Sequence, residues 1–137
     1  MTPDRRPTPP TGSPIGPLPG RTPVAISWAA AAAAHAGSAW FDGHTSTTTQ
    51  VIAVVLVSAA VAGVTLLLVA GGPRSLLLAV IAGAVGVLLW VLPLLAPGFG
   101  AAPWDLWAFV AALLDGLTAR LAAFALRRAQ PSARSAG

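Results

Sequence analysis

The chain has no cysteine, and lysine, glutamate, asparagine and tyrosine are also absent from its 137 residues. Without cysteine it has no disulfides, thiolate metal sites or cysteine nucleophiles. Charged residues make up only 9% of the chain, whereas soluble domains carry roughly a quarter. So few charges cannot cover a water-soluble globule, and we predict that lipid surrounds most of the chain. The remaining bias toward Ala, Gly, Pro and Arg is typical of a GC-rich, actinobacterial-like genome, and hence of a plasma membrane.

Apolar residues are what the chain does contain, at 55% of its length. They fall into stretches at about residues 24–41, 51–70, 76–96 and 104–126. About 20 apolar residues in a helix cross a hydrocarbon core of about 30 Å, and short connections make successive helices antiparallel neighbours. The sequence therefore predicts an all-α, polytopic membrane protein: a compact antiparallel bundle of four transmembrane helices within residues 24–126.

The arginines predict the orientation of this bundle. Those outside the apolar stretches precede the first stretch, lie between the second and third, or follow the fourth: Arg5, Arg6, Arg21, Arg74, Arg127, Arg128 and Arg134. Positive charge that flanks a span stays in the cytoplasm, so both termini are expected there. The net charge of +4 is spread along the chain and forms no basic stripe, so nucleic acid is not a predicted partner. Arg127 and Arg128 are expected to bind anionic lipid headgroups.

The two ends of the chain are predicted to be tails. Residues 1–23 are rich in Pro, Thr and Gly, which predicts a disordered cytoplasmic tail with polyproline character. Residues 127–137 form a basic cytoplasmic tail. The first apolar stretch has a second interpretation, because the apolar run 24–34 and the A-x-A sequence at 34–36 resemble a signal peptide with its cleavage site. Cleavage would leave three spans, and both interpretations stay open at this stage.

Ionisable residues inside the apolar stretches are the candidates for function: His35, Asp115 and Arg120. Each charge there costs about 2.5–3.5 kcal/mol on insertion scales. Asp115 is predicted near the membrane midplane and His35 at a similar depth, so a His35–Asp115 pair would either fix helix packing or accept protons. Arg120 is expected to reach the headgroups with its long side chain. Thr118 shares the helix face of Asp115, at a spacing where it could form a hydrogen bond to it.

Small residues at four-residue spacing predict where helices pack closely. Gly63 follows Ala59 at this spacing, and Gly83 and Gly86 follow Ala79 and Ala82. We predict helix-packing roles for the three glycines, with the partner of Gly83 and Gly86 left open. Tryptophan and phenylalanine favour the two membrane interfaces, which predicts interfacial positions for the aromatic residues near the ends of the stretches: Trp28, Trp40, Phe41, Trp104 and Trp107.

One short segment resembles a known family. Residues 115–120, Asp-Gly-Leu-Thr-Ala-Arg, are similar to the DGxxAR core of the CDP-alcohol phosphatidyltransferases, membrane enzymes that use divalent metal. The family pattern requires an aspartate where this chain has Ala112, a glycine where it has Ala129, and two further aspartates that this chain lacks. Without those carboxylates the paired metal site cannot be built, so the resemblance predicts no enzyme here.

No other motif predicts a catalytic, metal or cofactor site. His35 and His44 are nine residues apart, and Asp42 alone stands near them, which is not the spacing of a metal site. The prediction is a non-enzymatic integral membrane protein that serves as an accessory, assembly or scaffold component, with a protein partner or a second copy of itself. The alternatives are a small oligomeric transporter or pore that uses Asp115, and a phage-type holin.

Overall fold

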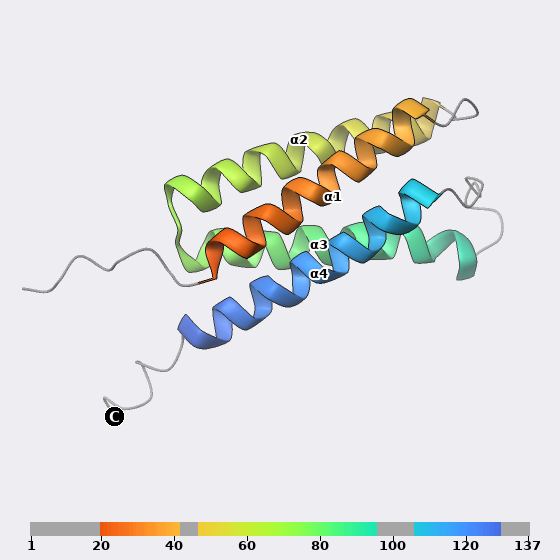
Figure 1. Cartoon of the computed structure of the whole chain (residues 1–137). Coiled ribbons are helices and arrows are strands. Elements are labelled where there is room, and N and C mark those ends of the chain that lie inside the picture. Colours follow the sequence, from red (N-terminus) through yellow and green to blue (C-terminus); the bar gives the residue numbers. More distant parts are fainter. Residues whose placement is uncertain (1–19, 42–46, 96–105, 130–137) are drawn as a thin grey trace, which may run out of the picture.

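The computed structural model describes residues 20–41, 47–95 and 106–129, which form an all-helical fold (Figure 1). In chain order the helices are α1 (Arg21–Phe41), α2 (Thr47–Val69), α3 (Pro73–Leu95) and α4 (Leu106–Ala129). They alternate in direction, so that the start of α1, the α2–α3 turn and the end of α4 lie at one end of the molecule (Figure 1). The predicted all-α class is confirmed.

Three of the helices are long and apolar enough to cross a membrane: Thr47–Val69, Pro73–Leu92 and Leu106–Ala129. The first helix, α1, is of similar length at 21 residues but is not among them. Its hydropathy is lowered by polar residues, among them Ser27 and His35. Ser27 is buried and His35 is partly buried, so the polarity of α1 faces the other helices. The structure thus supports three candidate spans by length and composition.

The helices extend beyond the predicted spans at several ends. Residues 21–23, which the sequence assigned to the disordered tail, form the first turn of α1. Pro23 fits there because the first-turn amides of a helix have no intrahelical acceptor. Residues 127–129, assigned to the basic tail, continue α4. Residues 1–19 and 130–137 of the predicted tails, together with Asp42, His44 and Trp104, lie outside the described residues.

A tight turn joins α2 to α3. Gly71 takes a φ of 55°, a left-handed conformation that glycine adopts readily, and its amide donates to the carbonyl of Leu66 at 3.4 Å. Pro73 then occupies the first position of α3, where its fixed φ suits a helix start. The Ser75 hydroxyl donates to the carbonyl of Gly72 at 2.7 Å. This local chemistry reverses the chain within three residues.

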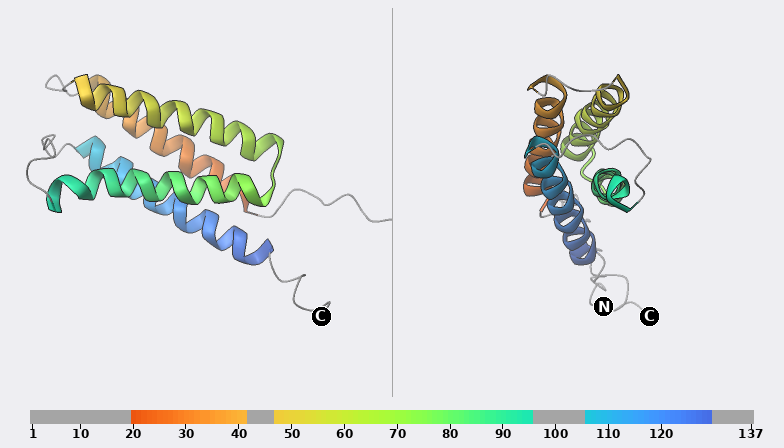
Figure 2. Two further views of the ribbon diagram at one scale, coloured as in Figure 1. Left: turned by 180° about the vertical axis from the view of Figure 1, so that it is seen from behind. Right: turned by 90° about the vertical axis from the view of Figure 1, so that its right-hand side faces the viewer.

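The four helices pack in the order α2, α1, α4, α3. The α3–α4 and α1–α4 pairs make the most extensive contacts, and α1 also packs on α2. Contacts between α2 and α3 are much sparser although a turn connects them. Figure 2 shows these two ribbons separating as they leave the turn. The helix pair that is most distant in sequence, α1 and α4, is therefore central to the fold.

Small side chains dominate the core between the helices. Apart from alanine and glycine, the fully buried side chains are few: Val24, Leu67, Leu76 and Thr118. Many of the larger apolar residues of α2 and α3 are exposed, as Val54, Leu68 and Leu88 are. In lipid such an arrangement is expected, because apolar side chains gain little from burial and small ones let helix backbones approach.

Candidate functional site

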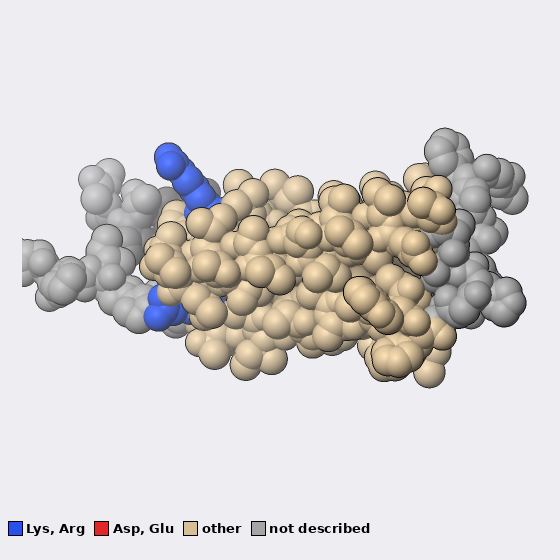
Figure 3. Space-filling model, turned by 90° about the horizontal axis from the view of Figure 1, so that it is seen from above, with Lys and Arg blue, Asp and Glu red and all other residues tan. Residues whose placement is uncertain are grey.

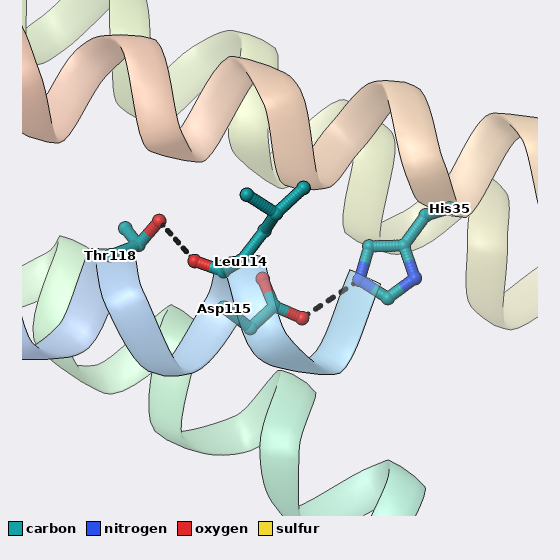
Figure 4. A network of polar contacts seen from close by, with 4 residues as sticks. All are labelled: His35, Leu114, Asp115 and Thr118. Carbon is teal, nitrogen blue, oxygen red and sulfur yellow. Dashed lines mark hydrogen bonds and ion pairs between the residues drawn. The ribbon is translucent and has the colours of Figure 1, made fainter. Parts of the chain in front are cut away.

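A histidine and an aspartate from the first and last helices meet inside the bundle. The Nε2 atom of His35 lies 2.8 Å from Oδ2 of Asp115, and Figure 4 shows the imidazole reaching from α1 toward the carboxyl group on α4. The side chains are 17% and 6% exposed. The sequence suggested that His35 and Asp115 pair because they lie at similar depths, and in the structure the two side chains are in direct contact. It gives two ionisable groups, each unfavourable alone in an apolar interior, a mutual hydrogen bond.

Glycines of α3 make room for this pair. A methyl group on Gly86 would collide with the Oδ2 and Cγ atoms of Asp115. One turn earlier, a methyl group on Gly83 would collide with the backbone oxygen of Asp115 and come within 3.0 Å of Ala119 Cβ. The small-residue stripe of α3 therefore packs against α4 of the same chain, which gives Gly83 and Gly86 an intramolecular partner.

Hydroxyl groups form a second polar contact between α1 and α4. The Thr118 hydroxyl lies 2.9 Å from Ser27 Oγ and 2.8 Å from the carbonyl oxygen of Leu114 (Figure 4), and Ser27 Oγ lies 3.1 Å from the carbonyl oxygen of Val24. The two hydroxyl protons can serve two of these three contacts at a time. The sequence also allowed a hydrogen bond from Thr118 to Asp115, but in the structure the hydroxyl contacts Ser27 and the carbonyl of Leu114.

The sequence also misplaced Trp28. Its indole is only 4% exposed, so the ring packs against other helices and is not offered to surrounding headgroups. It fills a notch above Gly63 of α2, where a methyl group would collide with the ring. Gly63 is thus a helix-packing residue of the α1–α2 contact in this structure. The other described aromatics near the helix ends, Trp40, Phe41 and Trp107, are exposed.

The aromatic end of the bundle is organised around Trp107. Its ring stacks on Phe41 with centroids 6.2 Å apart, and it lies 3.0 Å from the position that a methyl group on Gly37 would take. Phe41 ends α1 and Trp107 lies near the start of α4, so these rings close the α1–α4 pair at one end. Arginines mark the other end.

Apart from Arg120, the described arginines belong to the end of the bundle that contains the α2–α3 turn. Figure 3 shows arginine side chains at that end of the molecule and no charged residue over the rest of the described surface on the visible face. Arg21 donates from Nη1 to the carbonyl of Leu68 at 3.4 Å, where α2 leaves its last carbonyls without helical partners. Arg74, Arg127 and Arg128 are exposed.

Arg120 lies on the outer surface of α4 and does not contact Asp115. Its guanidinium carbon is 5.9 Å from the ring centroid of Phe124, one turn closer to the arginine end. Arg120 and Phe124 are both exposed, so the guanidinium lies on the outside of the bundle. That it reaches lipid headgroups stays a prediction.

The chemistry that this arrangement offers is hydrogen bonding and proton exchange within the His35–Asp115 pair. Within residues 20–41, 47–95 and 106–129, no three His, Cys, Asp or Glu side chains come together in a way that would hold a metal ion. The segment 115–120 that resembles the phosphatidyltransferase core is used here in packing: Asp115 contacts His35 and Gly86, and Thr118 contacts Ser27.

Comparison with known proteins gives no family for this chain: no family model, no curated protein and no solved structure matches it.

Proposed function

We propose that this chain is a non-enzymatic integral protein of the plasma membrane, which crosses the bilayer four times and serves as an accessory, assembly or scaffold component. The observation that carries the proposal is the His35–Asp115 contact. The buried carboxyl group of this chain is engaged by another helix of the same chain, at 2.8 Å. What the bundle presents to its surroundings is apolar helix surface and one arginine-bearing end.

The packing of α1 supports a fourth crossing. At 1.5 Å per residue, its 21 residues extend about 30 Å, which matches the hydrocarbon core. It lies antiparallel to α2 and α4, both of which are apolar enough to span. Ser27 is buried and His35 is largely covered, while Ile26 is exposed. A helix that hides its polar residues against other spans crosses lipid at lower cost than its composition alone implies.

The arginine end supports an orientation with both termini in the cytoplasm. Arg21 and Arg74 lie at the start of α1 and of α3, and Arg127 and Arg128 lie in the last turn of α4. Because positive residues flank spans on the cytoplasmic side, this end is assigned to the cytoplasm. The exposed Arg127 and Arg128 are then placed to bind anionic headgroups, at about 1 kcal/mol for each charge.

The same contact argues against the transporter alternative. A polar path between copies of the chain needs Asp115 to face a neighbouring copy. Instead the carboxyl group lies against Gly86 of its own chain and is 6% exposed. If the pair has a structural role, the outer faces of α2 and α3 are the surfaces that contact lipid and a partner protein.

The test combines purification with transport. The full chain is purified from its native membrane in a mild detergent, and we expect a protein partner to co-purify with it at a fixed stoichiometry. The Asp115→Asn variant is expected to keep both this partner and the cellular phenotype. Reconstituted in proteoliposomes, the chain is expected to conduct neither protons nor small ions. A pH-dependent flux that Asp115→Asn abolishes would replace the scaffold proposal with transport.

A further inference from the structure

A small cavity lies where the four helices meet. Every helix contributes to its wall, and its volume is about 20 Å³. The lining residues are Trp28, Ala32, His35, Leu56, Ala59, Ala60, Ala82 and Asp115. A buried water molecule needs about 10–15 Å³ of such space. The cavity is therefore the size of a single water molecule, and it borders both members of the His35–Asp115 pair.

The carboxyl group of Asp115 has hydrogen-bonding capacity left over. Oδ2 accepts from or donates to His35 Nε2, whereas Oδ1 has no hydrogen-bonding partner among the described residues. Figure 4 shows this second oxygen turned away from the imidazole. A buried polar atom without a partner is unfavourable, because it has given up its hydrogen bonds to water. A water molecule beside it removes that cost.

The ionisable groups that line the cavity are those of the pair itself. The residues that α2 and α3 contribute, Leu56, Ala59, Ala60 and Ala82, are apolar. From α1 come Trp28, Ala32 and the imidazole, and Arg120 of α4 points to the outer surface. No described arginine is available to balance a charge left on the pair.

The net charge of the pair follows from the number of protons that it holds. With one proton shared between the imidazole and the carboxyl group, it is neutral overall. Removing that proton leaves a net negative charge in an apolar interior, and adding another leaves a net positive charge, and both are unfavourable. Exchange of the shared proton for another from water costs no net charge, provided that water reaches the pair.

We propose that the cavity at the four-helix junction is a water site through which the His35–Asp115 pair exchanges its proton with bulk water. The water molecule donates to Oδ1 of Asp115, and one proton leaves the pair as another arrives. Its route lies between α2 and α3, the helix pair with the sparsest contacts around the bundle. This site is independent of the accessory role proposed above, and either proposal can fail alone.

The experiment follows the imidazole of His35 by nitrogen NMR in the full chain, reconstituted in lipid. His44→Gln leaves His35 as the single histidine, so its ring signals are unambiguous. Magnetisation transfer from water to the His35 ring is expected in this background. If no transfer is seen, and the ring proton exchanges no faster than the most protected helix amides, the proposal is overturned. This measurement leaves every residue of the cavity wall unchanged.

Filling the cavity provides the second measurement. Ala60→Val and Ala82→Val each add methyl groups to its wall, and Ala62→Val adds the same groups to the exposed surface of α2 as a matched control. Exchange at His35 is expected to slow on the order of tenfold or more in the first two, because it must then wait for local opening of the helices. If a folded Ala60→Val or Ala82→Val variant exchanges its His35 proton as fast as the Ala62→Val control does, the proposal is overturned.

Discussion

Gly86 of α3 lies directly against the carboxyl group of Asp115 of α4, with no space for even a methyl group between them. The position of the carboxyl group, and with it the 2.8 Å contact to His35, depends on the absence of a side chain on a third helix. Three helices are thereby fixed to one another at a single point.

The first prediction concerns this glycine. Gly86→Ala is expected to push Asp115 away from His35 and to destabilise the bundle by about 1–3 kcal/mol, the usual cost of overpacking. The measurement is the thermal unfolding midpoint in one detergent, followed by circular dichroism. Gly116→Ala is the control, because a methyl group there meets Val87 at an ordinary 3.6 Å. Equal midpoints for the two variants would contradict the close fit.

The second prediction concerns the pair itself. Asp115→Ala leaves His35 without its buried partner and is expected to cost about 3–5 kcal/mol of stability. Asp115→Asn keeps an acceptor for the imidazole N–H and is expected to cost much less. A double-mutant cycle with His35→Ala measures the coupling, expected at about 0.5–3 kcal/mol. Additive single effects would mean that the two side chains do not interact in the membrane.

The third prediction concerns Trp28 and its notch at Gly63. Trp28→Ala removes a buried indole between α1 and α2 and is expected to cost about 3–5 kcal/mol. The control is Trp40→Ala, because Trp40 is 81% exposed and should change stability little. Unfolding midpoints in the same detergent compare the two. A larger loss for Trp40 would place Trp28 outside the core.

The fourth prediction concerns topology. Reporter fusions at residues 44, 74, 100 and 137 are expected to show residues 74 and 137 in the cytoplasm and residues 44 and 100 outside. Because the chain has no cysteine, single cysteines at the same positions give a second readout by labelling intact cells. Labelling of position 74 from outside would overturn the orientation, and an external N-terminus ahead of α2 would indicate cleavage of the first stretch.

The sequence identified the members of the site better than their partners. His35 and Asp115 were evident because ionisable residues in apolar helices are rare, and Gly83 and Gly86 because small residues at this spacing permit close approach. The spacing of these small residues predicts that another helix packs closely against them, but it does not identify that helix. That the approaching helix is α4, and that Asp115 occupies the notch, depends on tertiary packing that the spacing does not contain.

Trp28 and Ser27 show why the rest was missed. Tryptophan near the start of an apolar stretch ordinarily indicates an interface, and only the opposing Gly63, distant in sequence, allows it to be buried. A usable signal did exist. Ser27 and His35 lie about two turns apart in α1, and Asp115 and Thr118 lie one turn apart in α4. Polar faces on two apolar helices predict that the helices pair.

The contact between α1 and α4 also joins two helices that leave the ribosome at different times. His35 and Asp115 are 80 residues apart, so the nascent chain exposes the imidazole well before its partner is synthesised. Until then α1, which is not among the helices apolar enough to span on their own, lacks the carboxyl group that engages its imidazole. The packing of α1 against α4 must therefore follow the synthesis of α4.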